Sequence, residues 1–458
     1  MGGAVMDRES IRRRFEDNHI RRVKLGAFDI DATLRGKYIS VEKFWSAAES
    51  GLGFCDVIFG WDIGDVLYDN VKFTGWHTGY PDAHCRIDFG SYRLVPWEPG
   101  TAFFLLDFCD AEGQPLAIAP RQVFQRVLDR AAERGYTAHF SAEYEFFIFR
   151  ETAQTLRDKH FAALTPLTPG MFGYSVTRAS ANADLVLEIM EALAAFDVPL
   201  EGFHTETGPG VYEAAIAVEP GLAAADRAAL FKVAVKEIAA RHSLTPTFMA
   251  KWNAVLPGSS GHLHQSLSRT GNLDNLFSAE AADGGMSELM RNYVAGLVTN
   301  LPELAAIFCP TINSYKRTVP GAWAPVNATW GVDNRTTAVR AIPTVHNNRK
   351  KSTRVELRLT GADINPYLAM AASLAAGLDG IERKLELPPL TVNAYFGDAP
   401  PLPRTLADST RLFRQSRVAR EWLGEQFVDH YASTREWEVR QYEKAVTDWE
   451  LARYFESV

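Results

Sequence analysis

The sequence predicts an α+β protein with a smaller β-rich N-terminal domain and a larger C-terminal α/β domain. Between about residues 24 and 110, short segments alternate apolar and polar residues and are separated by turns rich in glycine and proline. Beyond about residue 115, helical patterns alternate with apolar strands. A turn around Gly113 separates the two regions, so we predict domains at residues 1–113 and 114–458.

Local signals delimit the first elements of each domain. Residues 7–25 carry a charged helical pattern that leads into an apolar segment, which predicts a helix followed by a strand. In the second domain, Pro120 stands where a helix would start, and apolar residues follow at helical spacing. Gly135 marks the expected end of that helix.

Composition excludes several classes of partner. The 458 residues contain 48 Lys and Arg against 56 Asp and Glu, a net charge of −8. An acidic chain is not built to coat nucleic acid or an anionic membrane, so we expect no nucleic acid and no membrane as partners. No apolar run approaches the roughly 18 residues of a membrane span. The four cysteines are scattered without a CxxC pair, which predicts free thiols and a cytoplasmic location.

Two carboxylates interrupt an apolar segment. Residues 142–149 read AEYEFFIF and predict a buried strand, on which Glu143 and Glu145 share one face. Burying two like charges side by side is costly unless cations neutralise them. The alternative is a strand end at the surface, where both side chains meet water.

Two further motifs carry groups that bind metals. In HTETGPGVYE, a Gly-Pro-Gly turn could fold Glu206 and Glu213 together, although such a segment alone would be only a charged loop. In GSSGHLHQS, His262 and His264 share one strand face after a glycine loop. One histidine is commonly a satisfied core residue, and two at this spacing are less often so.

Basic residues lie close to another acidic strand. RVELR places Arg354, Glu356 and Arg358 on one face. A basic run precedes it, and the segments NSYKRTVPG and DNRTTAVR add lysine and arginines. A charge run is usually a solvated face, but this one leads directly into the acidic strand. Arginine suits carboxylates and phosphates because its guanidinium donates two parallel hydrogen bonds.

These segments together predict a metal site. Oxygen-rich sites with few nitrogens suit Mg²⁺ or Mn²⁺ rather than zinc, and five carboxylates exceed what one such ion takes. Two or more ions beside several arginines are typical of phosphoryl transfer from a nucleotide such as ATP. The chain contains no P-loop and no kinase motif set, so ATP would bind through another architecture. The five carboxylates are those of Glu143, Glu145, Glu206, Glu213 and Glu356.

Six motifs in order resemble the glutamine synthetase superfamily, in its bacterial class I-like branch: AEYEFFIF, HTETGPGVYE, GSSGHLHQSL, NSYKRTVPG, DNRTTAVR and RVELR. The resemblance implies an N-terminal β-grasp domain and a larger C-terminal catalytic domain whose antiparallel sheet forms a funnel. ATP would enter at one end and glutamate at the other, with the ions at the waist. It also implies a homo-oligomer, a dodecamer of two hexameric rings with active sites between subunits.

The resemblance assigns roles to individual residues. One ion would be held by Glu145, Glu206 and Glu213, beside glutamate, and the other by Glu143, His262 and Glu356. The glutamate-binding positions would be Gly258, Arg317 and Arg358. Arg335 and Arg340 would stabilise the transferring phosphoryl group. The nucleotide-side positions would be Glu201, His264, Ser266, Lys351 and Arg354.

The implied chemistry has two steps. ATP phosphorylates the γ-carboxylate of glutamate, which turns a poor electrophile into an acyl phosphate with a good leaving group. Metals and arginines neutralise the charge of the transfer. A nitrogen nucleophile then displaces phosphate, giving ADP, phosphate and a γ-glutamyl amide.

The sequence departs from the family where ammonium would bind. The family's flap usually reads Pro-Gly-aromatic-Glu-Ala-Pro, and here Trp323 stands at the glutamate position. An indole cannot accept a proton or neutralise ammonium. The usual Asp-Gly-Ser-Ser loop of the N-terminal domain is also absent, and Asp62 is the candidate for its aspartate.

Three hypotheses follow. The first is a γ-glutamyl-amine ligase that uses an aryl-, alkyl- or polyamine, with Trp323 and Trp61 as an aromatic wall. The second is a glutamine synthetase that uses ammonia despite the altered flap, with Trp323 as a loop anchor. The third is a non-catalytic structural relative, against which the intact acidic residues argue.

Overall fold

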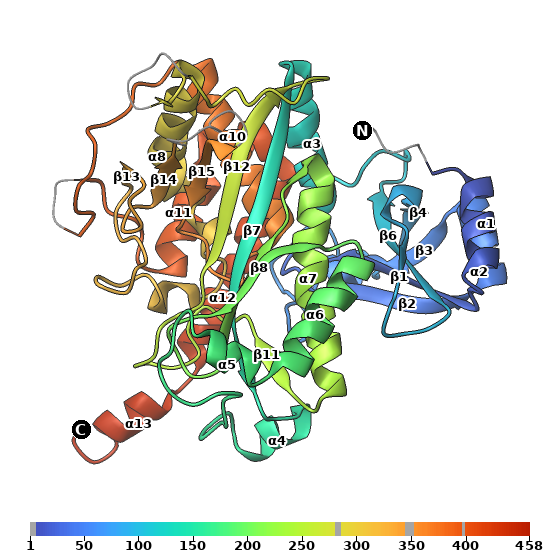
Figure 1. Cartoon of the computed structure of the whole chain (residues 1–458), viewed down its shortest axis with the longest axis horizontal. Coiled ribbons are helices and arrows are strands. Elements are labelled where there is room, and N and C mark those ends of the chain that lie inside the picture. The colour runs from blue at the N-terminus through green and yellow to red at the C-terminus, as the bar shows by residue number, and fades with distance from the viewer. Residues whose placement is uncertain (1–5, 280–284, 344–351, 396–398) are drawn as a thin grey trace.

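The computed structural model describes residues 6–279, 285–343, 352–395 and 399–458. Two separate sheets organise this part of the chain, one of six strands and one of nine. Figure 1 shows the N-terminal sheet, with its helices, beside a larger body built around the long strands β7 and β12. The expected mixture of helices and sheets is confirmed.

The N-terminal sheet has the order β2-β1-β6-β4-β3, with β5 beside β6. β1 and β6 run parallel, and its other pairs are antiparallel. Its strands are β1 (Arg22–Phe28), β2 (Leu34–Ser40), β3 (Leu52–Cys55), β4 (Asp82–Ile87), β5 (Arg93–Leu94) and β6 (Thr101–Cys109).

Two helices accompany this sheet. The predicted first helix is α1 (Arg8–Asp17), which is shorter than its charged pattern and precedes β1 as expected. The second, α2 (Val41–Ser50), interrupts a region expected to be β-rich. Its helical spacing buries Phe44 and Ala47, and the Ser40 hydroxyl accepts a hydrogen bond from the Lys43 amide. Neither this helix nor its cap was predicted from the sequence.

The larger sheet has the order β13-β14-β15-β12-β7-β9-β8, and β10 and β11 also pair with β7. All its pairs are antiparallel except β13 with β14, which are parallel. Its strands are β7 (Tyr136–Phe149), β8 (Leu200–Thr205), β9 (Val211–Ile216), β10 (Glu219–Pro220), β11 (Thr245–Thr247), β12 (Gly261–Arg269), β13 (Trp330–Val332), β14 (Val339–Ile342) and β15 (Arg354–Leu357).

Helices pack against this sheet and against each other. α3 and α7 contact β7, and α10 contacts α8 closely. A Cβ atom on Gly296 of α8 would lie 2.2 Å from the Ala376 carbonyl oxygen of α10, so this crossing requires glycine. The expected helix from Pro120 is confirmed as α3. The helices are α3 (Pro120–Glu133), α4 (Ala153–Asp158), α5 (Val176–Ser180), α6 (Ala183–Ala195), α7 (Gly221–Arg241), α8 (Glu288–Phe308) and α10 (Pro366–Glu382).

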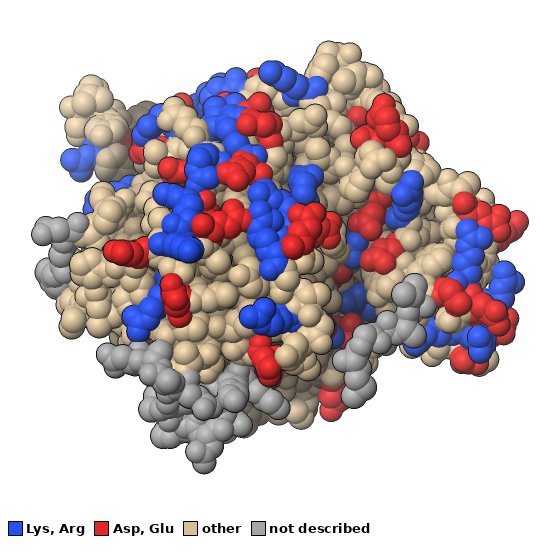
Figure 2. Space-filling model, turned by 90° about the horizontal axis from the view of Figure 1, so that it is seen from above, with Lys and Arg blue, Asp and Glu red and all other residues tan. Residues whose placement is uncertain are grey.

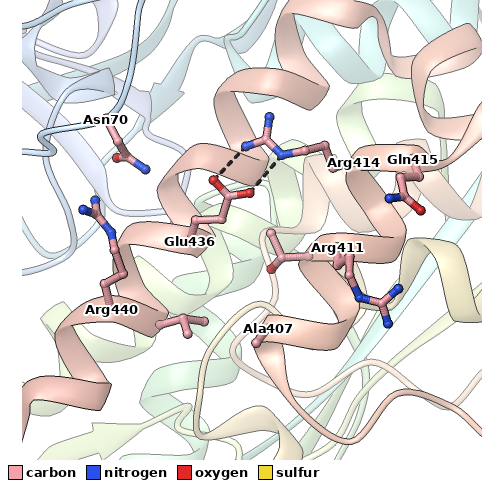
Figure 3. Close-up of a pocket in the computed structure, with 9 residues that line it drawn as sticks. Asn70, Ala407, Arg411, Arg414, Gln415, Glu436 and Arg440 are labelled. Carbon is pink, nitrogen blue, oxygen red and sulfur yellow. Dashed lines mark hydrogen bonds and ion pairs between the residues drawn. The ribbon is translucent and has the colours of Figure 1, made fainter.

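Three C-terminal helices follow: α11 (Leu406–Gln415), α12 (Glu425–Lys444) and α13 (Asp448–Tyr454). Figure 3 shows Arg414 of α11 facing Glu436 of α12, with two nitrogen–oxygen distances of 2.9 Å. This pair lines a cavity of about 570 Å³ that Asn70 of the N-terminal region borders. The Asn70 amide donates to the Ser433 carbonyl at 2.7 Å, which ties that region to α12.

The distribution of surface charge and the state of the cysteines agree with what the composition predicts. Figure 2 shows acidic and basic side chains interspersed over the described residues of one face. All four cysteines are free, as expected. Among the described residues, no helix is both long and apolar enough to cross a membrane.

Candidate active site

Strand register brings the predicted acidic side chains together. Glu143 of β7 is the partner of His262 on β12, and Glu145 of β7 is the partner of Glu213 on β9. These pairs lie on one face of the sheet, because residues two apart on a strand point the same way. The alternative of a strand end at the surface is wrong, since β7 is a central strand.

One group of side chains, the Glu143 cluster, consists of Glu143, His262, His264 and Glu356. The His264 Nε2 atom lies 3.1 Å from Glu143 Oε1, and His262 Nδ1 lies 3.3 Å from Glu356 Oε1. Ligand atoms of Glu143, His264 and Glu356 lie within 4.8 Å of one another. The structure therefore places His264 within a group that could hold a metal ion, with His262 beside the same two carboxylates.

Both carboxylates of the Glu143 cluster are held in the charged form. Burial opposes this for Glu143, but hydrogen bonds from His262 and His264 lower its pKa below the ordinary value. Burial also opposes ionisation of Glu356, whereas the charges of His262 and Arg358 lower its pKa to about 2. Ionised carboxylates are the form that binds a divalent cation.

A second group, the Glu206 cluster, consists of Glu145, His204, Glu206 and Glu213. The two nitrogens of His204 lie 3.7 Å from Glu206 Oε1 and 3.6 Å from Glu213 Oε1. The Gly-Pro-Gly turn therefore folds the two glutamates together, as predicted. The Glu213 carboxylate raises the pKa of His204 to about 9.

Sequence reasoning missed two residues of the Glu206 cluster's surroundings. His204 stands two positions before Glu206, so strand alternation could have placed both on one face. Tyr174 stacks on His204 with ring centroids 4.5 Å apart, and 71% of its side chain is exposed. Tyr174 lies on a separate loop, and its own backbone amide donates to the Thr205 carbonyl at 2.7 Å. No local pattern would have predicted that contact.

Glu145 is buried beside another carboxylate, that of Glu213. Burial raises its pKa to about 7, and the neighbouring charge of Glu213 adds to the shift. The Ser260 amide donates to its Oε2 atom at 2.7 Å, which fixes its position. A cation beside Glu145 and Glu213 would relieve this repulsion.

Arg317 lies deep beside Glu145. It is 3% exposed and donates to the carbonyls of Leu359 and Arg358 at 3.0 and 3.1 Å. A Cβ atom on Gly258 would come 2.8 Å from Arg317 Cγ, so glycine there gives the arginine room. The structure thus brings two of the predicted glutamate-binding residues into contact.

The other predicted arginines gather around Glu356. Arg340 donates to Glu356 Oε2 at 2.8 Å and to Asp333 Oδ1 at 3.0 Å. Arg358 donates to Glu356 Oε1 and, at 3.1 Å, to the Arg335 carbonyl oxygen. The Arg335 side chain is exposed. This basic group therefore adjoins the Glu143 cluster through Glu356.

The predicted nucleotide-side residues are brought together only in part. Arg354 Nε donates to His264 Nδ1 at 3.0 Å, and Ser266 follows His264 on the same strand face. Glu201 is exposed at an irregularity of β8, which is separated from β12 by β9 and β7. Lys351 lies outside the described residues.

Trp323 and Asp62 differ from the rest in their surroundings. Trp323 is 65% exposed and has a positive φ of 56°. Asp62 lies in the N-terminal domain, where its Oδ1 atom accepts the amides of Gly64 and Val66 at 2.8 Å. In the described part of the chain, no recorded contact joins Asp62 to either acidic cluster.

The donor sets fit divalent metal ions. The two clusters offer five carboxylates and three imidazoles on facing strands, which suits Mg²⁺ or Mn²⁺. Glu145 and Glu213 oppose each other on neighbouring strands, where a bound cation would offset their like charges. The residues present therefore fit the metals that the sequence predicts.

Comparisons with known proteins agree with this geometry. The family described as glutamine synthetase, catalytic domain, matches residues 117–454. Type-1 glutamine synthetase 2 of Dictyostelium discoideum is 48% identical over 442 residues, which cover 95% of this chain and 84% of that protein. Glutamate–isopropylamine ligase of a Pseudomonas species is 39% identical, and the match covers 98% of both chains.

A solved structure supports the same conclusion. The structure described as a GmaS/ADP complex matches with a TM-score of 0.84 and 29% identity, over 98% of this chain and 99% of that one. The similarity thus extends through both sheets. The chain belongs to the glutamine synthetase family of ATP- and divalent-metal-dependent carbon–nitrogen ligases.

Proposed function

We propose that the protein forms a γ-glutamyl amide from glutamate, ATP and an organic amine. The observation that carries this is the presence of two intact acidic clusters together with Trp323 at the flap position. The clusters supply what phosphorylation of glutamate needs. Trp323 removes the carboxylate that an ammonium substrate would need.

The first step activates glutamate. Arg317, with Gly258 beside it, and Arg358 bind and orient the glutamate carboxylates by charge-assisted hydrogen bonds. Arg335 and Arg340 approach the transferring phosphoryl group and offset its negative charge. Glu143, His262 and Glu356 would hold one divalent ion and Glu145, Glu206 and Glu213 another, and such ions would supply positive charge that offsets the negative charge of the transfer. We assign His264, Ser266 and Arg354 to the nucleotide side, together with Glu201 and Lys351, whose assignment rests on the family pattern alone.

The second step attaches the amine. Tyr174 stacks on His204 beside Glu206, and its exposed ring offers an aromatic surface for an amine's hydrocarbon part. Trp323, also exposed, supplies a second such surface when the flap closes. A neutral arylamine needs no base, whereas a protonated alkylamine would give its proton to an acidic group such as Asp62. The Pseudomonas relative is named for an organic amine, which supports this assignment.

Glutamine synthesis from ammonia is the second candidate. The Dictyostelium relative, at 48% identity, is named a glutamine synthetase. The two functions share the first step and differ only in the nucleophile. Turnover with ammonia alone would favour this candidate.

We further propose the finer architecture that the family implies. The boundary lies near residue 113, and the N-terminal sheet forms a β-grasp domain. The subunits assemble as a dodecamer of two hexameric rings, in which Asp62 reaches a neighbour's site. The exposed apolar side chains of the last helix, including Trp449 and Leu451, support an interface there. A cytoplasmic location accompanies this assignment.

Product analysis tests the proposed function. The protein is incubated with glutamate, ATP, Mg²⁺ and a panel of ammonia, ethanolamine, putrescine, isopropylamine and aniline. We expect ADP, phosphate and one γ-glutamyl amide in equal amounts, identified by mass spectrometry. Formation of no ADP with any amine would instead support a non-catalytic relative.

A further inference from the structure

Two buried cations lie near the same acidic residue, Asp363. Arg317 is 3% exposed, and Lys232 of α7 is 8% exposed. In the described residues, neither has a carboxylate within ion-pair distance. Burying a cation without a paired charge is costly, so a nearby anion must offset both charges.

Lys232 is stabilised mainly by neutral groups. Its Nζ atom donates to the Ile364 carbonyl at 2.7 Å and lies 4.7 Å from the ring centroid of Tyr144. Burial lowers its pKa to about 7, and the charge of Asp363 opposes that shift. Lys232 and Asp363 both line a cavity of about 840 Å³ that reaches the N-terminal region.

Arg317 has the same electrostatic neighbour. Burial lowers its pKa, whereas the charges of Cys309, Glu145 and Asp363 oppose the shift. Its guanidinium donates only to neutral oxygens, including the Ser260 hydroxyl at 3.3 Å. Asp363 is therefore a charge that the two buried cations share.

Asp363 also fixes the backbone that leads to Arg317. Its Oδ2 atom accepts hydrogen bonds from Thr311 Oγ1 at 2.9 Å and Ser314 Oγ at 2.6 Å. Ser314 opens a 3₁₀ turn, Ser314–Lys316, and Arg317 is the next residue. Among the described residues, the buried Oδ1 atom has no hydrogen-bond partner. One carboxylate oxygen thus holds the turn, while the negative charge, which both oxygens share, acts on the neighbouring cations.

We propose that Asp363 is a positioning residue for glutamate binding, which fixes Arg317 through the Ser314 turn and balances the charges of Arg317 and Lys232. This inference deepens the proposed function, because it rests on Arg317 binding glutamate. The recorded hydrogen-bond partners of Asp363 are the hydroxyls of Thr311 and Ser314. Its effect on glutamate is carried by Arg317, and its effect on stability by Lys232.

The test separates these two effects. In Asp363→Asn, the amide oxygen still accepts the two hydroxyls but the charge is lost. The Kd for glutamate, measured by calorimetry with Mg²⁺ and ADP, should rise about tenfold, the loss expected for one charge-dependent interaction. The Kd for ADP should stay unchanged. Asp17→Asn, an exposed aspartate in α1, serves as the matched control.

A double variant distinguishes positioning from simple destabilisation. Asp363→Asn should lower Tm because Lys232 must then either stay charged without a compensating anion or give up its proton in the folded state, and adding Lys232→Met should restore Tm. The raised Kd for glutamate should persist in Asp363→Asn/Lys232→Met. A wild-type Kd in Asp363→Asn, or a Kd that recovers together with Tm, would overturn the inference.

These experiments also distinguish failure of the positioning role from failure of the proposed function. Glutamate binding that depends on Asp363, without ligation of any amine, would overturn the function and support the positioning role. If the wild-type chain does not bind glutamate, both are wrong. Ligation of an amine with an unchanged Kd in Asp363→Asn would overturn the positioning role alone.

Discussion

Glu145 and Glu213 face each other directly across β7 and β9, two acidic residues at one register position of a central sheet. Like charges at such positions destabilise a sheet, and burial adds to the cost. The raised pKa of Glu145 records that cost. A cation bound between the strands would offset this repulsion, so the strand pairing favours a metal ion at Glu145 and Glu213.

Glu145→Gln tests this relationship through stability. The amide keeps an acceptor for the Ser260 hydrogen bond but removes the repelled charge. At pH 8 without metal, we expect the free energy of unfolding to rise by about 1–3 kcal/mol. Denaturant titrations with EDTA and with Mn²⁺ measure both effects, since the variant should lose most of the stabilisation that Mn²⁺ gives.

Glu191→Gln, at an exposed position of α6, is the control for that experiment. It should change neither the metal-free stability nor the response to Mn²⁺. Equal stabilisation of Glu145→Gln and wild type by Mn²⁺ would argue against a metal at Glu145.

Trp323→Glu tests the nucleophile. Because Trp323 is 65% exposed, the substitution should leave the fold intact. Restoring a carboxylate on the flap should raise kcat/KM for ammonia relative to the best organic amine by about tenfold or more, roughly the effect of one charge-assisted interaction. Trp76→Glu, at a position that is 83% exposed, is the matched control. If the ratio of kcat/KM for ammonia to that for the organic amine is unchanged, Trp323 does not determine which nucleophile the protein uses.

Steady-state kinetics should distinguish the roles of His262 and His264, the two histidines of the Glu143 cluster. The family pattern assigns His262 to the metal and His264 to the nucleotide, whereas the geometry places both near Glu143. We expect His262→Ala to raise the Mg²⁺ concentration for half-maximal activity, and His264→Ala to raise KM for ATP, each about tenfold. The reverse pattern would exchange their roles.

How much of the site could be predicted from the sequence depends on how far apart along the chain the contacting residues lie. The i, i+2 spacing of Glu143 and Glu145 predicted a shared face, and β7 confirms it. The contact between His264 and Glu143 depends on register between strands more than a hundred residues apart, which no local pattern specifies. Tyr174 was missed for the same reason, since it reaches His204 from a separate loop.

The fold shows the same division. Pro120 and the helical spacing after it predicted α3, because capping and periodicity are local. α2 was missed within a region of mixed pattern, although its Ser40 cap was visible. The shared charge of Asp363 could not be predicted at all, since Arg317 and Lys232 meet it only through tertiary packing.

His430 predicts how stability depends on pH. Burial lowers the pKa of this α12 residue to about 4 from 6.5, so the unfolded chain binds its proton first. Stability is therefore lost as pH falls between these two values. His430→Gln should remove about 2 kcal/mol of the loss between pH 7 and pH 5. Denaturant midpoints at both pH values measure it, and a parallel loss in both proteins would show that His430 does not contribute.

The most direct test of the central claim is the ratio of kcat/KM values for organic amines and ammonia. Phosphate release is followed with glutamate, ATP and Mg²⁺ saturating and each nucleophile varied. We predict that at least one of isopropylamine, ethanolamine, putrescine and aniline exceeds ammonia by tenfold or more, as expected if aromatic contacts replace the missing flap carboxylate. A higher kcat/KM for ammonia than for every organic amine would contradict the account.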